Sequence, residues 1–501
     1  MAAETIPTPL VTACQDVRPT SPADAVAGVL PQLVASPAST QECSELLKAA
    51  SELGLAVIPR GAGSRMDWGN PPARCDLVID MTRMNRVIEH AAGDLVATVE
   101  AGVSLEHLAE VLGAAGQRLA LDPHPHPLHP PPAAHRLGAG QGLPDGDDSA
   151  AIAPVSTRGT VGGVLATGAA GPLRLRYGTP RDLLLGITVV RADGTVAKSG
   201  GKVVKNVAGY DLGKLFAGSR GTLGLITQAT FRLHPVPVTT AYVTVQRAAA
   251  VDACQAIGVA LESPVAPVAV EIDWPSAAGP VTVSIALEGD PMGVAQRATA
   301  LADLLRRTDR SPAGSDTPPP WWGAGPAAQP DGTVLQVAFW PGDLGMVLAE
   351  IRAAAEVAGL DPAVGGSAAA GLLHVACPAD RDPGAIAAFV AGLRAAVGHG
   401  LRPETGHRLS DVPKPLAHAR AHAHSHAHGR GGAAEPAGPG EPRSGEGPPA
   451  RANVVVLHAP PAVGDLVDLF GPVPSLGLMR AIKDQFDPHR VMSPGRFAGG
   501  I

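Results

Sequence analysis

The chain has 501 residues and a net charge of −7, which argues against nucleic acid as its main partner. It contains no apolar run of about 20 residues, so we expect no transmembrane segment. Five scattered cysteines, none in Cys-x-x-Cys spacing, encode neither an iron–sulfur ligand run nor a zinc ribbon and fit reduced thiols in a cytosol. The length allows two or three domains. Residues 1–30 lack the features of a secretory signal, and we expect a loose N-terminal extension.

The elements expected next form a first α+β lobe. A helix over residues 40–53 carries a capping box at Ser39 and Glu42 and stops at Gly54. Ser104 caps a second helix, which ends at Gly116. Short apolar or alternating runs predict strands at residues 32–35, 55–58, 76–80, 94–100 and 119–121.

A glycine loop, Pro59-Arg60-Gly61-Ala62-Gly63-Ser64, follows the strand at 55–58 directly. Gly61 and Gly63 allow a bulky anion to approach backbone N–H groups, and Arg60 adds a charge that suits phosphate. We interpret the loop as a pyrophosphate cradle. A tight turn without a ligand stays open as the alternative, since Met66 stands where the dinucleotide fingerprint has its third glycine.

A second glycine-rich segment, Thr160 to Gly171, opens a second lobe. Thr160 can cap a short helix whose first N–H groups attract phosphate, while the alternative is close helix packing, which small residues also serve. A hairpin turn at Asp193-Gly194 joins strands at 186–191 and 195–198. A basic, glycine-rich run at 200–211, a short helix at 212–216 and a strand at 225–233 follow.

From residue 241 onward, strands alternate with amphipathic helices, which predicts a cap domain with an antiparallel sheet covered by helices. A helix at 476–486 and an irregular tail end the chain. Three stretches rich in Pro, Gly or His, at 124–150, 311–330 and 413–450, are read as largely disordered surface insertions. The alternating histidines of the last stretch could chelate a divalent ion adventitiously, but we expect no physiological metal site.

The glycine segments, Tyr177 to Asp182, Gly209-Tyr210-Asp211 and Gly221 to Ile226 together resemble the FAD-binding domain of the vanillyl-alcohol oxidase/PCMH flavoprotein superfamily, from about Leu33 to Pro237. Residues 63–70, 204–212 and the tail from Phe486 to Arg496 look like the FAD-binding E subunit of bacterial glycolate oxidase. The resemblance implies an α+β fold with two lobes and a C-terminal antiparallel-sheet cap. Its boundaries are 1–30 for the extension, 31–237 for the FAD-binding domain, 238–475 for the cap and 476–501 for a tail returning to the FAD domain.

The resemblance also implies roles for individual residues. The first loop would cradle the pyrophosphate, the second would contact phosphate or ribose, and the next positions would abut the flavin, shape its wall, close over the adenosine or lie near the substrate. Ser64 stands where covalently flavinylated relatives carry a histidine, so we expect non-covalent FAD. The expected cofactor-binding residues are Arg60, Gly61, Ala62, Gly63, Ser64, Thr160, Gly162, Gly163, Thr167, Gly168, Gly171, Tyr177, Arg181, Asp182, Lys205, Asn206, Tyr210, Leu223, Gly224 and Ile226.

The function implied is oxidation of glycolate to glyoxylate through FAD, in a cytoplasmic glycolate oxidase complex that could lie at the inner face of the membrane through its partners. The chain lacks the His-x-Gly-Asp-Gly-Asn stretch of catalytic relatives. This favours an accessory FAD subunit beside a catalytic flavoprotein and an iron–sulfur subunit. Two alternatives stay open: a self-sufficient FAD-dependent dehydrogenase or oxidase of 2-hydroxy acids or alcohols, and a non-catalytic protein with a degenerate nucleotide site.

Overall fold

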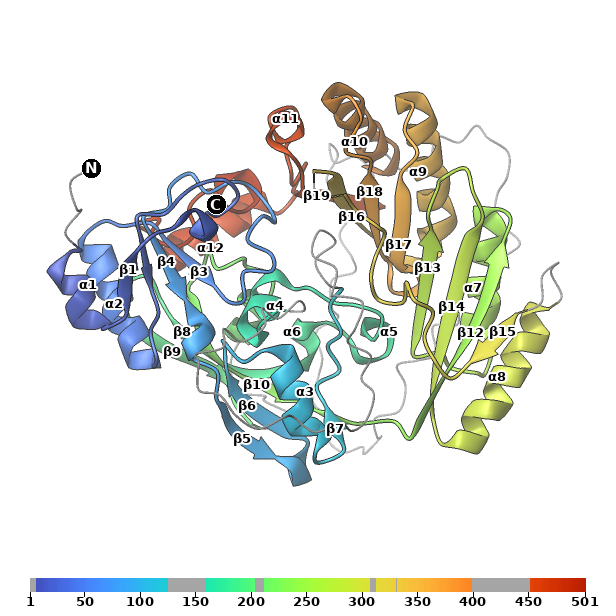
Figure 1. Cartoon of the computed structure of the whole chain (residues 1–501), viewed down its shortest axis with the longest axis horizontal. Helices are drawn as coiled ribbons and strands as arrows, with labels where there is room; N and C mark the ends of the chain where they lie inside the picture. Colours follow the sequence, from blue (N-terminus) through green and yellow to red (C-terminus); the bar gives the residue numbers. More distant parts are fainter. Residues whose placement is uncertain (1–5, 125–158, 203–210, 307–311, 330, 399–450) are drawn as a thin grey trace, which may run out of the picture.

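The computed structural model describes residues 6–124, 159–202, 211–306, 312–329, 331–398 and 451–501. The fold has two halves, which lie side by side along the long axis of the molecule (Figure 1). The first half contains two sheets with short helices, and the second contains one large sheet with long helices. This is the α+β architecture expected from the sequence.

The first sheet has the strand order β1-β2-β4-β3 and carries the first glycine loop at the end of β3. Strands β2, β4 and β3 run parallel, and β1 pairs with β2 in the antiparallel sense. Their side chains pack with α2, whose N-cap Ser39 accepts a hydrogen bond from the Glu42 N–H as predicted. The elements are α1 (Thr8–Ala13), β1 (Val17–Pro19), β2 (Leu33–Ala35), α2 (Thr40–Glu52), β3 (Val57–Arg60) and β4 (Leu77–Asp80).

The second sheet is antiparallel, with the order β5-β6-β10-β8-β9. It joins strands from both predicted lobes, because the strand expected at 94–100 pairs with β10 and not with the first sheet. Two further strands, β7 and β11, form a small ribbon. The elements are β5 (Val87–Ala91), β6 (Val96–Glu100), α3 (Leu105–Gly113), β7 (Gln117–Arg118), α4 (Val161–Thr167), α5 (Arg174–Tyr177), α6 (Pro180–Leu183), β8 (Leu184–Val190), β9 (Val196–Gly200), β10 (Leu225–Arg232) and β11 (His234–Pro235).

The cap is one antiparallel sheet of eight strands in the order β15-β12-β14-β13-β17-β18-β16-β19, as the alternating pattern predicted. Its apolar side chains face the helices, whereas the opposite face carries the buried polar residues Glu271 and His374. The elements are β12 (Thr239–Arg247), α7 (Ala250–Glu262), β13 (Ala269–Trp274), β14 (Val281–Gly289), α8 (Pro291–Leu305), β15 (Ala313–Ser315), β16 (Thr333–Phe339), α9 (Leu344–Ala358), β17 (Ala363–Ser367), β18 (Leu372–Cys377), α10 (Pro383–Gly398), β19 (Ala452–His458) and α11 (Pro461–Gly464).

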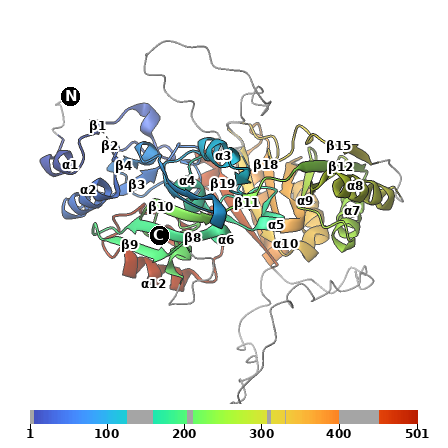
Figure 2. The same ribbon diagram turned by 90° about the horizontal axis from the view of Figure 1, so that it is seen from below.

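The tail helix α12 (Leu476–Phe486) returns to the first half and lies against its second sheet (Figure 2). The rings of Phe216 and Phe486 meet edge to face, with centroids 5.7 Å apart. The last residues then run along the edge of β3, as described below. In the part of the chain that the structure describes, no helix has both the length and the apolar character needed to cross a membrane.

Two regions expected to be loose are ordered. The N-terminal extension folds from residue 6 into α1 and β1, with Leu10 fully buried, because its apolar residues complete the first core. Within the stretch expected as the second insertion, β15 adds an edge strand to the cap and the Trp322 ring packs against Tyr242 with centroids 5.0 Å apart. Residues 413–450, with the histidine run, lie outside the described residues.

Candidate functional site: a cleft between two glycine loops

The two glycine loops meet in one place. A Cβ on Gly61 would lie 2.1 Å from Thr160 Oγ1, so the first loop approaches the second more closely than any side chain would allow. Thr160 is the N-cap of α4, and its Oγ1 accepts a hydrogen bond from the Gly163 N–H at 3.3 Å. A Cβ on Gly162 would lie 2.7 Å from the Ala101 Cβ, which seats α4 on the end of β6. Small residues are therefore required where β3, β6 and α4 converge.

A cleft runs between these loops and holds about 860 Å³ of atom-free space, part of it open to solvent. Eleven of the twenty residues expected to bind the cofactor line it: Arg60, Gly61, Ala62, Gly63, Ser64, Thr160, Gly162, Gly163, Thr167, Gly224 and Ile226. Three others, Lys205, Asn206 and Tyr210, lie outside the described residues.

The remaining six expected residues do not line this cleft. Gly168 caps the C-terminus of α4, and Leu223 belongs to the buried core. Gly171 packs against the Asp122 carbonyl, since a Cβ there would lie 1.8 Å from that oxygen. The Tyr177 hydroxyl, the Arg181 carbonyl and the Asp182 carboxylate are bound to other protein groups.

Tyr177 lies at the junction with the cap. Its hydroxyl donates to Glu288 Oε2 at 2.9 Å and accepts from Arg118 Nη2 at 2.9 Å. Arg118 in turn pairs with Glu288 at 2.6 Å, and both side chains are largely buried. The tyrosine expected to form part of the flavin wall therefore belongs, within the described residues, to a polar contact that ties β7 to β14.

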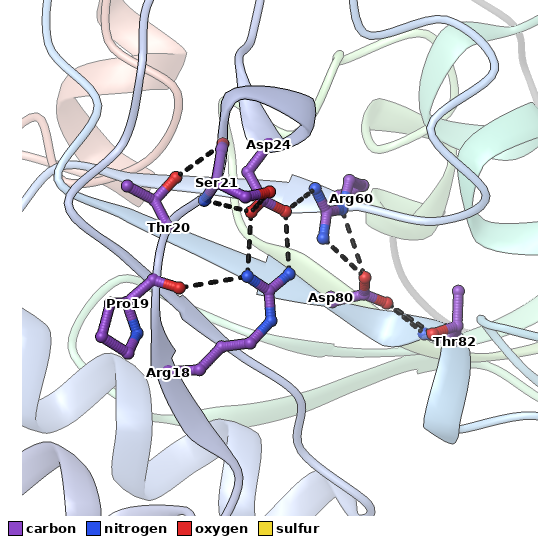
Figure 3. A network of polar contacts seen from close by, with 8 residues as sticks. All are labelled: Arg18, Pro19, Thr20, Ser21, Asp24, Arg60, Asp80 and Thr82. Carbon is purple, nitrogen blue, oxygen red and sulfur yellow. Dashed lines mark hydrogen bonds and ion pairs between the residues drawn. The ribbon is translucent and has the colours of Figure 1, made fainter.

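Arg60 lines the cleft, but its charge is shared with two carboxylates. Its guanidinium forms ion pairs of 2.8 Å with both Asp24 and Asp80 (Figure 3). Arg18 also pairs with Asp24, and these two arginines hold the pKa of the Asp24 carboxyl far below its usual range. The role expected of Arg60 as a phosphate cation therefore stays a prediction, and two carboxylates share its charge, one of them from the N-terminal segment that was expected to be loose.

Three other arginines bring positive charge to the cleft, and sequence reasoning assigned none of them. Arg65, Arg220 and Arg496 line the cleft. Burial lowers the pKa of each guanidinium to about 10. Within the described residues, no carboxylate lies within ion-pair distance of Arg220 or Arg496. Arg65 follows the glycine loop directly, and Arg496 belongs to the tail motif Pro494-Gly495-Arg496. The local sequence around these two arginines could therefore have indicated them.

The side chains of these arginines are fixed by different contacts. Arg65 donates to the His124 carbonyl at 2.9 Å. The Arg220 guanidinium stacks on the Phe470 ring, 5.2 Å from its centroid. Arg496 donates to the Asn70 carbonyl at 3.1 Å. The three cations thus come from distant parts of the chain and meet at one cleft.

The C-terminal tail delivers Arg496 by pairing with the edge of β3. The Val57 N–H donates to the Val491 carbonyl at 2.7 Å, and the Ser493 N–H donates to the Val57 carbonyl at 2.8 Å. A fully buried ion pair, Lys483 Nζ to Asp487 Oδ2 at 2.6 Å, holds the turn between α12 and this pairing. The strand that leads into the first glycine loop therefore also anchors the end of the chain.

A diphosphate fits this arrangement. Buried cations without carboxylate partners require an anion, since an uncompensated buried charge is costly. The glycines at the loop contact allow the backbone to come close to a bulky group. The residues present therefore suit the FAD that the sequence implies. Among the described residues, no group of three or more His, Cys, Asp or Glu side chains could hold a metal ion.

Comparisons with known proteins find similarity in the part of the chain that contains both glycine loops. Residues 31–127 and 151–200 match the FAD binding domain family. Glycolate oxidase subunit GlcD of Bacillus subtilis is 32% identical over 211 residues, 42% of this chain and 38% of that protein. D-lactate dehydrogenase of Archaeoglobus fulgidus is 35% identical over 203 residues, 40% of this chain and 39% of that protein. The chain thus spans less than two fifths of the length of these curated relatives.

Solved structures extend the likeness to the whole fold. p-Cresol methylhydroxylase with substrate bound superposes with a TM-score of 0.62 at 14% identity, covering 97% of this chain and 95% of that one. Alkyldihydroxyacetonephosphate synthase gives a TM-score of 0.57 at 17% identity, with 93% and 78% covered. The chain thus matches the FAD binding domain family over residues 31–127 and 151–200 and shares the overall fold of p-cresol methylhydroxylase.

Proposed function

We propose that this chain is an FAD-dependent oxidoreductase that acts on the hydroxyl-bearing carbon of a small 2-hydroxy acid, with glycolate as the first candidate. The observation that carries the proposal is the cleft in which two glycine loops and the cations Arg220 and Arg496 meet, within and beside the segment that matches the FAD binding domain family. The named relatives that oxidise glycolate or lactate support the substrate class.

In this proposal the residues of the cleft bind and orient the cofactor. Arg220 and Arg496 neutralise the diphosphate, while the loop around Gly61 and the start of α4 at Gly162 let it lie against the backbone. When bound, FAD supplies the acceptor for the hydride removed from the substrate. The side chains of Arg65 and Trp68, which stack at 5.2 Å, form another part of the cleft lining and help to exclude water.

The finer proposal is that the chain serves as the FAD-binding subunit of a glycolate oxidase complex, with a catalytic flavoprotein and an iron–sulfur subunit as partners. The resemblance of the loops and tail to the E subunit and the GlcD relative support it. We place the complex in the cytoplasm, held at the inner face of the membrane through partners. The alternative is a self-sufficient FAD-dependent 2-hydroxyacid or alcohol dehydrogenase, which the D-lactate dehydrogenase relative favours.

Anaerobic flavin reduction by the purified chain tests these proposals. We expect a yellow protein whose flavin passes into the supernatant on acid precipitation, as non-covalent binding requires. Glycolate alone should leave the flavin oxidised if the chain is an accessory subunit, and should reduce it once the partner subunits are added. Bleaching by glycolate or D-lactate without partners would support the self-sufficient alternative. A colourless protein that takes up no added FAD would refute both.

A further inference from the structure

The junction between the two halves contains a pair of stacked histidines. His374 lies on β18 opposite Gly365 of β17, on the cap face that turns away from the cap helices. The His124 ring, from the FAD half, meets it edge on, with centroids 5.1 Å apart and planes at 81°. Helix α5, which carries Arg174, packs against β13 of the same sheet (Figure 1). The two histidines therefore meet where the halves touch, and Arg174 lies on a helix that packs against the same sheet.

Both histidines are buried and incompletely bonded. Each is 7% exposed. His124 Nδ1 lies 2.9 Å from the Gly323 carbonyl, which can only accept, so Nδ1 carries the proton and Nε2 is a bare acceptor without a partner among the described residues. His374 Nδ1 likewise has no partner within the described part of the chain. A buried nitrogen without a hydrogen-bond partner is costly, so the site calls for a ligand group.

Arg174 supplies a positive charge at the same place. Burial, with a contribution from the charges of Arg174 and Arg65, lowers the pKa to about 4 for His124 and about 3 for His374. The described residues give the Arg174 guanidinium no hydrogen bond and no ion pair. Asp182, the acidic group whose charge reaches it, accepts 2.8 Å hydrogen bonds from the Thr179 N–H and hydroxyl. The cluster thus combines the Arg174 guanidinium, which has no ion pair among the described residues, with two neutral imidazoles.

We propose that Arg174, His124 and His374 bind the carboxylate and neighbouring hydroxyl of a small organic acid. A guanidinium offers two parallel N–H donors to a carboxylate, and an unprotonated imidazole nitrogen accepts from a hydroxyl. Arg65, which lines the cleft, donates to the His124 carbonyl and so connects the two sites. The inference rests on the proposed function for the identity of the acid as substrate.

Titration with oxalate, a small carboxylate that is not a 2-hydroxy acid, tests the site by calorimetry. Arg174→Gln should weaken oxalate binding at least about tenfold relative to the unaltered chain. Arg174→Lys should restore only part, because an ammonium cannot form the parallel pair of hydrogen bonds. The matched control is Arg176→Gln, on the same short helix but exposed. It should bind oxalate like the unaltered chain. His374→Gln should also weaken binding, which covers the case in which an Arg174 variant fails to fold.

The outcome separates this inference from the proposed function. Flavin content and reduction by dithionite should be unchanged in Arg174→Gln, since this residue does not line the cofactor cleft. Oxalate binding at full strength in both Arg174→Gln and His374→Gln, or no oxalate binding by the flavin-loaded unaltered chain, would overturn the carboxylate site while leaving the FAD proposal standing. Oxalate binding that depends on Arg174 in a chain without FAD would instead support the site and refute the flavoprotein proposal.

Discussion

The buried ion pair between Lys483 and Asp487 gives the sharpest prediction, because it controls both stability and the cofactor cleft. Both side chains are fully buried. Lys483 Nζ donates to Asp487 Oδ2, to the Thr222 carbonyl at 2.7 Å and to the Met492 carbonyl at 2.8 Å. Asp487 accepts from the Val491 and Met492 N–H groups at 2.9 and 2.8 Å. The pair therefore binds α12 to the turn at Thr222 and to the tail that carries Arg496.

Replacing Asp487 by Asn leaves the Lys483 ammonium buried without its counter-charge. Removing one partner of a buried pair costs about 3–5 kcal/mol. We expect Asp487→Asn to lower the unfolding free energy of the FAD half by this amount and to loosen the tail, so that Arg496 no longer faces the cleft. In urea, flavin release monitored by its fluorescence should then occur at a clearly lower midpoint.

The matched control is Asp484→Asn, three residues earlier and within α12. Asp484 pairs with Arg490, but both side chains are about half exposed, and such surface pairs contribute about 0–1 kcal/mol. The double variant Lys483→Met/Asp487→Leu should cost less than the two single changes added together. If Asp487→Asn released flavin at the same urea concentration as Asp484→Asn, the buried pair would not hold the tail and the reasoning would be wrong.

Three further predictions concern the cleft, the cap and the junction. Gly61→Ala should lower FAD affinity, because its Cβ would lie 2.1 Å from Thr160 Oγ1. Fluorescence titration with FAD checks this. The control is Gly258→Ala, whose Cβ would meet no atom within 4 Å and which should leave FAD affinity unchanged. Burial raises the pKa of Glu271 from 4.5 to about 8, so the folded state keeps a proton that the unfolded state loses, and stability should fall as pH rises through this window by at most about 1.4 kcal/mol per pH unit. Denaturant midpoints of Glu271→Gln across this pH range should lack that decline; an identical slope in both proteins would contradict it. Arg118→Met, which breaks the largely buried ion pair at the junction, should lower thermal stability by about 2–3 kcal/mol in calorimetry, and an unchanged melting curve would show that the pair does not hold the halves together.

Much of the fold follows from short-range signals. The helix at 40–52 has its predicted cap, the tail helix spans the residues expected, and the cap sheet alternates as its pattern predicted. These features depend on neighbours within a few residues, so the sequence records them. Strand β17 (Ala363–Ser367) escaped prediction because its glycines weaken the strand pattern, and its place in the sheet comes from its partners β13 and β18.

The sequence by itself determined where small residues and a helix cap are needed at the contact between the two glycine loops. The glycines of the first loop and the Thr160 cap were identified from residue type and spacing, because only small residues and a capping side chain meet those local demands. Tertiary structure decided where the charges go. Arg60 is neutralised by Asp24, thirty-six residues earlier, while Arg496 arrives from the far end of the chain. Electrostatic partners are set by distance in space, and that distance exists only once the segments have packed together.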